Sequence, residues 1–253
     1  MASVDLEKVR VVVVGDSGVG KSSLVTLICR GQPNLYPSWT IGAAVDVKIH
    51  EYKEGTPAQK SYFVECWDIG GSVNHANSRH IFYNPVNGII LVHDLTNRKS
   101  HSNLRLWLSE VLSRESTYGT RSRTSTSEYD PEQFAGTRIP VLVVGTKHDQ
   151  LDSTRQTKLQ TSVIAEECGA DEINLDCTLA RHVAPGSTNA VKLSRFFDKV
   201  IYRRFYTNPA RDSPQKVIER RFFSRDSSQQ PVGSPTEKRR PFTPQFMKNL
   251  HTD

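Results

Sequence analysis

The chain has 253 residues, of which 36% are hydrophobic and 24% charged, and its net charge is +6. No apolar run approaches the roughly 20 residues that a membrane-spanning helix requires, and the first residues lack the layout of a signal peptide. The four cysteines are too few for a disulfide scaffold, and none forms a CxxC pair. This composition argues against secretion, membrane spanning and a structural zinc site, and it predicts a cytoplasmic protein.

Strand-like and helix-like segments alternate through the first 206 residues. Short apolar runs have the length of buried strands, and amphipathic segments follow most of them. This alternation predicts an α/β fold with a mostly parallel sheet, whose ligands bind beyond the carboxyl ends of the strands. Strands are expected at 9–14, 45–52, 60–67, 88–93, 139–145 and 173–177, and helices at 21–29, 104–113, 155–168 and 190–205.

Two segments depart from this alternation. Residues 114–138 are rich in Ser, Thr and Arg, which predicts a polar insertion. Residues 207–253 hold six of the thirteen prolines and nine basic against five acidic residues, or +4 of the net charge. We therefore expect one domain over 1–206 and a flexible basic tail over 207–253. Because most of the positive charge lies in the tail, the domain is not expected to bind nucleic acid.

The strongest motif reads GDSGVGKS at residues 15–22, directly after the first expected strand and before the first expected helix. It matches the phosphate-loop pattern GxxxxGK[ST], in which backbone amides surround phosphate oxygens. The ammonium of Lys21 can contact the β- and γ-phosphates, and the hydroxyl of Ser22 can bind Mg²⁺. The expected phosphate contacts are Ser17, Gly18, Val19, Gly20, Lys21 and Ser22.

Further magnesium and phosphate contacts are expected downstream. Asp68 follows a predicted strand and can hold Mg²⁺, while Thr40 is a plausible second ligand nineteen residues after Lys21. The amide of Gly71 can reach a γ-phosphate. The metal ligands predicted from the sequence are therefore Ser22, Thr40 and Asp68.

A base-recognition signal stands after the strand expected at 139–145. The carboxylate of Asp149 can accept both N1–H and N2–H of guanine, a pair of donors that adenine lacks. Lys147 can pack along the base, and an amide near Cys177 can donate to guanine O6. The guanine contacts predicted from the sequence are Thr146, Lys147, His148, Asp149, Asp176, Cys177 and Thr178.

In this order the motifs resemble the five nucleotide motifs of the Ras-superfamily small GTPases, and residues 15–22 and 94–97 look like the Rab branch. Residues 70–72, 129–134 and 189–199 are similar to one Rab-like subfamily. The resemblance covers about residues 7–206. It implies a P-loop NTPase fold with a six-stranded, mostly parallel sheet and five helices. It also implies GTP and GDP as ligands, Mg²⁺ as cofactor, two switch segments, and effector or regulatory proteins as partners.

Three departures from the family pattern affect the chemistry. Ser72 stands where hydrolysing relatives have the glutamine that orients water, so we expect slow hydrolysis and assign no catalytic residue. Thr146 replaces the usual asparagine of the base motif, which predicts loss of a tie to the phosphate loop and weaker binding. Pro33 and Asn34 lie where an aromatic side chain often covers the guanine, so faster nucleotide exchange is expected.

The ends of the sequence and its aromatic residues leave alternatives open. The last cysteine is Cys177 and Ala2 follows the first methionine, so neither C-terminal prenylation nor N-myristoylation, and no stable membrane anchor, is expected.

Trp39, Trp67 and 82–83 can serve a homodimer or partner interface, although core packing is the preferred interpretation. The alternative to a switch is a GTPase-like scaffold or dimer whose nucleotide is structural. An ATP-dependent phosphotransferase is disfavoured by Asp149.

Overall fold

The computed structural model describes residues 7–115, 137–152 and 161–207. The strands are β1 (Lys8–Val14), β2 (Ala43–Tyr52), β3 (Lys60–Ile69), β4 (Gly88–Asp94), β5 (Val141–Thr146) and β6 (Asp171–Asn174). The helices are α1 (Lys21–Arg30), α2 (Ala76–Arg79), α3 (Arg98–Ser102), α4 (Leu104–Glu115), α7 (Val163–Cys168) and α8 (Thr188–Ile201).

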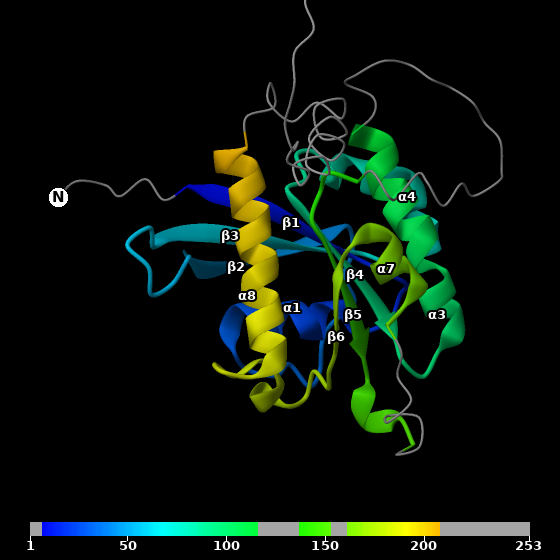
Figure 1. Cartoon of the computed structure of the whole chain (residues 1–253). Coiled ribbons are helices and arrows are strands. Elements are labelled where there is room, and N and C mark those ends of the chain that lie inside the picture. The colour runs from blue at the N-terminus through cyan, green and yellow to red at the C-terminus, as the bar shows by residue number, and fades with distance from the viewer. Residues whose placement is uncertain (1–6, 116–136, 153–160, 208–253) are drawn as a thin grey trace, which may run out of the picture. The chain divides into compact units, whose positions relative to one another are not determined.

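A six-stranded sheet in the order β2-β3-β1-β4-β5-β6 runs through the described domain (Figure 1). Strand β2 is antiparallel to β3, and all other neighbouring strands are parallel. The expected six-stranded, mostly parallel sheet is therefore confirmed. If α3 and α4 are counted as one helix interrupted at Asn103, the described residues also contain the five helices that the family resemblance implies.

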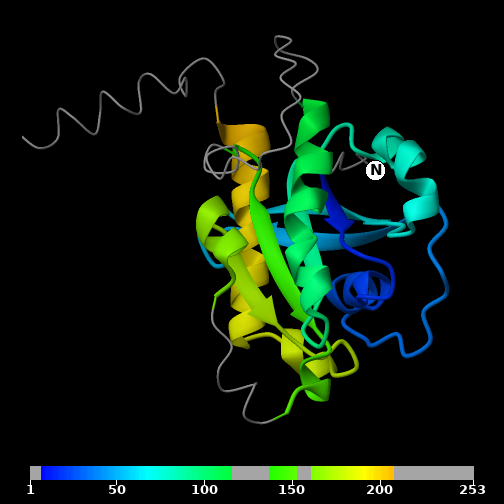
Figure 2. The same ribbon diagram turned by 90° about the vertical axis from the view of Figure 1, so that its right-hand side faces the viewer.

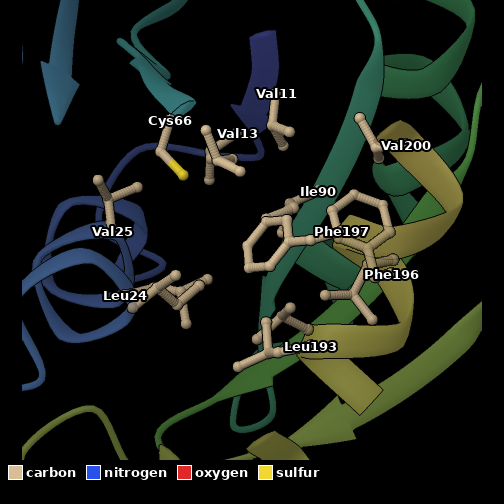
Figure 3. Close-up of a cluster of buried hydrophobic side chains, with 14 of the residues drawn as sticks. Val11, Val13, Leu24, Val25, Cys66, Ile90, Leu193, Phe196, Phe197 and Val200 are labelled. Atoms are coloured by element: carbon tan, nitrogen blue, oxygen red, sulfur yellow. The ribbon is translucent and has the colours of Figure 1, made fainter. Parts of the chain in front are cut away.

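Helices cover both faces of the sheet, which explains the continuous apolar runs of its central strands. Val11 and Val13 of β1 face α1 and α8, whereas Val12 and Val14 face the opposite core beneath α4 and α7. Figures 1 and 2 show α8 and α4 on the two sides of the sheet. Figure 3 shows Ile90 and Phe197 in the first core, where β4 meets α8.

The boundaries of two expected elements are wrong. The last strand ends at Asn174 and not at 177, because the chain turns there and the amide of Asp176 donates to Nδ1 of His182 at 2.9 Å. The helix expected over 155–168 begins only at Val163 within the described residues, with Ser162 in extended conformation before it.

Several predictions fall outside the described ranges. The insertion expected at 114–138 lies mostly there, although α4 continues to Glu115 and residues 137–138 are described. All of the expected tail except Thr207 also lies there, so the division into a domain and a tail stays a prediction. Among the described residues, no helix combines the length and apolar character needed to cross a bilayer.

Candidate nucleotide-binding site

The phosphate loop lies between β1 and α1, at the edge of the sheet where β1, β3, β4 and β5 all end. The loop enters α1 through Gly20, whose φ of 94° is in the left-handed region that favours glycine. No side chain caps the first amides of the ten-residue helix α1. These amides, together with the positive end of the helix dipole, suit a bound anion.

The ammonium of Lys21 is enclosed by this loop. Its Nζ donates to the carbonyl oxygens of Gly15 at 3.0 Å and Asp16 at 2.8 Å, and the residue is only 6% exposed. Burial lowers the pKa of Lys21, although the carboxylates of Asp68 and Asp16 act against this shift. Because an ammonium has three protons, one remains for an anion beside the two carbonyls.

The three predicted metal ligands meet in one place. The hydroxyl of Ser22 donates to Oδ2 of Asp68 at 2.5 Å, and the hydroxyl of Thr40 donates to the same oxygen at 2.8 Å. Ser22 Oγ and Thr40 Oγ1 are 3.0 Å apart. The other carboxylate oxygen of Asp68, Oδ1, is buried without a hydrogen-bond partner. Two hydroxyls and a buried carboxylate are hard oxygen donors, so these residues fit Mg²⁺.

A cleft of about 200 Å³ opens over the phosphate loop and the segment around Thr40. Gly71 closes one side of it: a Cβ atom there would lie 2.6 Å from the Gly15 carbonyl oxygen and 2.6 Å from the Ser17 nitrogen. Only glycine permits so close an approach of two backbone segments. The predicted contacts Ser17, Gly18, Gly20, Lys21, Ser22, Thr40 and Gly71 line this cleft, whereas Val19 is buried in the core.

Thr146 retains the connection to the phosphate loop that its replacement of asparagine was expected to remove. Its hydroxyl lies 2.5 Å from the carbonyl oxygen of Val19 and 3.0 Å from that of His93, and the side chain is fully buried. The expectation of a lost tie is therefore wrong. The side chain of threonine is short, but the end of β5 lies close enough to the phosphate loop for the hydroxyl to reach the Val19 carbonyl oxygen.

The rest of the base motif follows as a tight turn. Lys147 has a φ of 58°, and its Nζ forms an ion pair with Oδ2 of Asp94 at 2.6 Å. Burial would raise the pKa of Asp94, but Lys147 and Thr96 outweigh it, and the net shift is downward. The amide of His148 donates to the Leu175 carbonyl at 3.4 Å, which joins this turn to the chain after β6.

The second guanine segment has two of its three amides engaged. The amide of Asp176 donates to Nδ1 of His182, and the amide of Thr178 donates to Oδ1 of Asp176 at 2.7 Å. This leaves the amide of Cys177 as the candidate donor to guanine O6. Burial, with the carboxylates of Asp176 and Asp149, raises the pKa of the Cys177 thiol to about 12. The thiol therefore stays protonated beside the base motif.

The predicted residues thus form two groups at the same edge of the sheet. Most of the phosphate residues and the metal residues Ser22 and Thr40 line the cleft, and Asp68 lies behind it in contact with both hydroxyls. The second group does not line the cleft and consists of Thr146, Lys147, His148, Asp149, Asp176, Cys177 and Thr178. Thr146 connects the two groups through Val19.

A polar network behind the phosphate loop was not predicted from the sequence. Asp16 accepts hydrogen bonds from Asn103 and Trp107, and Arg79 pairs with Glu110. The spacing of Asn103, directly before α4, and Trp107, four residues later, was the available signal. The sequence held no such signal for Arg79, because a single arginine in a polar segment is expected to be exposed to solvent.

Apolar side chains around the cleft are more exposed than expected. Tyr36 is 92% exposed and Trp39 86%, so the preferred assignment of Trp39 to the core is wrong. Trp67 is partly buried, stacks beneath the guanidinium of Arg10 at 3.8 Å and packs beside Phe82. We use the term switch surface for the exposed apolar side chains on residues 35–41, on the edge strand β2 and at Val73. They are Leu35, Tyr36, Trp39, Ile41, Val45, Val47, Ile49 and Val73.

Comparison with known proteins shows the family to which the chain belongs. Residues 10–121 match the family model described as "Ras of Complex, Roc, domain of DAPkinase". The chain is 50% identical to Rab-like protein 3 of Homo sapiens and 49% identical to that of Danio rerio, each over 259 aligned residues and 100% of both chains. It is 41% identical to Small GTPase LIP1 of Arabidopsis thaliana over 152 residues, which cover 56% of this chain and 42% of that protein. The chain belongs to the Rab-like protein 3 family of Ras-superfamily small GTPases.

Proposed function

We propose that the protein is a guanine-nucleotide switch that binds GTP and GDP with Mg²⁺ and hydrolyses GTP slowly. The observation that carries this proposal is that Lys21, Ser22 and Thr40 line one cleft beside the phosphate loop, with Asp68 bound to both hydroxyls behind it. Members of the small GTPase family bind these ligands generally, and this chain keeps the donors that such binding requires.

Each group has a distinct task in this proposal. Lys21 and the amides of the loop neutralise the phosphates, and Gly71 is placed to meet a γ-phosphate. Ser22, Thr40 and Asp68 would hold Mg²⁺, which when bound offsets the charge between the β- and γ-phosphates. Asp149 selects guanine through its two acceptor oxygens.

Slow hydrolysis rests on Ser72, which lines the cleft next to Gly71. A serine side chain is two atoms shorter than the glutamine of hydrolysing relatives and offers no amide. The side chain of Ser72 would then not orient the attacking water, so GTP would be hydrolysed slowly and the GTP-bound state would be long-lived.

The switch surface supports partner binding in the cytoplasm, with a second copy of the chain as one candidate partner. Exposed apolar patches of this kind are typical of protein interaction sites. The surface includes Thr40's neighbours Trp39 and Ile41, so a change at a γ-phosphate would alter the surface that a partner meets.

Calorimetric titration of nucleotide-free full-length protein tests the proposal. We expect GDP and a non-hydrolysable GTP analogue to bind at least 100-fold more tightly than ADP and the matching ATP analogue, and chelation of Mg²⁺ to weaken the GTP analogue most. Lys21→Ala should lose binding, with the exposed Lys8→Ala as the matched control. Equal affinity for adenine and guanine nucleotides would overturn the guanine assignment.

A further inference from the structure

Helix α4 and the residue before it connect the phosphate loop to the segment that follows Gly71. Trp107 donates from Nε1 to Oδ1 of Asp16 at 2.8 Å, and Asn103 donates from Nδ2 to Oδ2 of the same carboxylate at 2.8 Å. Both oxygens of Asp16 are therefore held by the first turn of α4 and the residue before it. Since Asp16 directly follows the first glycine of the loop, these bonds fix the loop backbone relative to α4.

The same helix holds the segment after Gly71 through Arg79. The guanidinium forms a bidentate pair with Glu110, with Nε 2.9 Å from Oε1 and a terminal nitrogen 2.8 Å from Oε2. It also lies 4.3 Å from the ring centroid of Trp107 and donates to the backbone carbonyl of Ser72 at 2.9 Å. Arg79 is 5% exposed, so its guanidinium is buried although the carboxylate of Glu110 is partly exposed.

The electrostatics keep this arginine charged in place. Burial by itself would lower the pKa of Arg79, but the hydrogen bonds and charge of Glu110 outweigh it, and the net shift is upward. Glu110 also accepts the hydroxyl proton of Tyr83 at 2.8 Å. A planar, bidentate and stacked guanidinium of this kind cannot be replaced by the point charge of lysine.

The two connections meet at the cleft. Arg79 holds the carbonyl of Ser72, and the preceding residue, Gly71, packs against the backbone of Gly15 and Ser17. Trp107 contacts Arg79 with its ring and Asp16 with its N–H, so one side chain touches both connections.

We propose that Arg79 is a positioning residue that sets the preference for GTP over GDP. Arg79 holds Ser72, and with it the amide of Gly71, at the phosphate loop. Trp107 contacts both Arg79 and Asp16 and so keeps this segment and the phosphate loop in a fixed relative position. This inference rests on the proposed function, because it requires that the amide of Gly71 contacts the γ-phosphate, which GTP has and GDP lacks. A purely structural role for Arg79 would affect both nucleotides alike.

The test compares the affinity of the full chain for GDP and for a non-hydrolysable GTP analogue, both with Mg²⁺. Arg79→Met removes the donors and keeps the stem, whereas Trp107→Phe keeps a ring beneath Arg79 but removes the hydrogen bond to Asp16. The matched control is Arg105→Met, which breaks another Arg–Glu pair of α4, with Glu167 at 2.6 Å.

Arg79→Met should weaken the GTP analogue by about tenfold and GDP by less than twofold. Trp107→Phe should shift the same ratio by about threefold, and Arg105→Met should leave it unchanged. Equal weakening of both nucleotides, or an unchanged ratio, would overturn the inference. If Arg79→Met does not fold, the ratio for Trp107→Phe decides alone. Wild-type protein that binds neither nucleotide would instead overturn the proposed function, and this inference with it.

Discussion

The hydroxyl of Thr146 lies 2.5 Å from the carbonyl oxygen of Val19, so the strand that leads into the base motif also holds the phosphate loop. The same hydroxyl is 3.0 Å from the carbonyl of His93, at the end of β4. One side chain at the end of β5 therefore joins the two halves of the candidate site. A single hydroxyl proton serves both acceptors, so its loss would remove the side-chain connection between β5 and the phosphate loop.

Thr146→Val should destabilise the domain by about 1–3 kcal/mol, because it keeps the shape of the side chain but removes the buried hydroxyl that contacts both carbonyl oxygens. It should also speed nucleotide release, since the loop loses its tie. Urea unfolding and a fluorescent GDP chase measure the two effects. Thr56→Val is the matched control, because Thr56 is exposed and its hydroxyl donates to the Lys53 carbonyl in the turn between β2 and β3. Wild-type stability and release in Thr146→Val would contradict this account of the tie.

Asp68→Ala should remove most of the effect of Mg²⁺ on nucleotide release. In the wild type, chelation of Mg²⁺ should accelerate GDP release by at least tenfold, because the ion holds the β-phosphate against Ser22 and Asp68. The variant should release GDP quickly with or without Mg²⁺. Asp46→Ala, which breaks a pair with Arg30 on the surface, serves as the control. A full response to Mg²⁺ in Asp68→Ala would show that the ion binds elsewhere.

Asp149→Asn should change the base preference from guanine to xanthine. Asparagine offers one acceptor and one donor, and xanthine has a carbonyl where guanine has its 2-amino group. We expect GDP affinity to fall by at least 100-fold and xanthosine diphosphate to bind in its place. Competition titration with both nucleotides measures the change. Retained preference for GDP would remove Asp149 from base recognition.

Ser72→Gln should accelerate GTP hydrolysis in a single turnover by about an order of magnitude, because the longer amide can orient water. GDP affinity should not change, since the side chain acts only at the γ-phosphate. Phosphate release after rapid mixing measures the rate. A wild-type rate as fast as that of Ser72→Gln would refute slow hydrolysis.

His93 should make the domain less stable in mild acid. Its two ring nitrogens are buried without partners beside His101, with the ring centroids 4.8 Å apart, and burial followed by the charge of His101 lowers the pKa of His93 to about 4. The unfolded chain takes up this proton near pH 6.5, whereas the folded protein takes it up only near pH 4. The stabilisation that comes from keeping His93 neutral is therefore complete above pH 6.5 and is lost as the pH falls towards 4. Between pH 7 and pH 5 the loss should be about 2 kcal/mol.

Urea unfolding of His93→Gln at both pH values checks this expectation. The variant should show a smaller loss of stability in acid than the wild type, whatever its stability at pH 7. His75→Gln, at an exposed position, should keep the wild-type response. An identical pH response in His93→Gln and wild type would exclude His93 as its source.

Much of the fold follows from local sequence signals. The apolar runs at β1, β4 and β5 are long enough to be buried on both faces, and only a parallel sheet between helices accommodates them. The phosphate loop was readable because its glycines, lysine and serine keep a fixed spacing that the backbone path requires. Its side chains and those of Thr40 and Asp68 do converge as expected.

The remaining features depend on contacts between distant parts of the chain. The reach of Thr146 to Val19 depends on how closely β5 approaches the loop, which no local pattern encodes. Arg79 is buried only because Glu110 and Trp107, about thirty residues later, surround it. Trp39 was expected in the core, but no element among the described residues covers its ring, which leaves it 86% exposed. Such tertiary effects override residue preference.

The identity and exchange rate of the nucleotide on freshly purified protein test the central claim most directly. Denaturing extraction with chromatography identifies what is bound, and a fluorescent GDP chase gives its rate of release. The account predicts stoichiometric GDP or GTP that exchanges and whose release is faster after Mg²⁺ is chelated. Guanine nucleotide that never leaves would contradict a switch and favour a scaffold, and an empty or adenine-loaded site would contradict the guanine assignment itself.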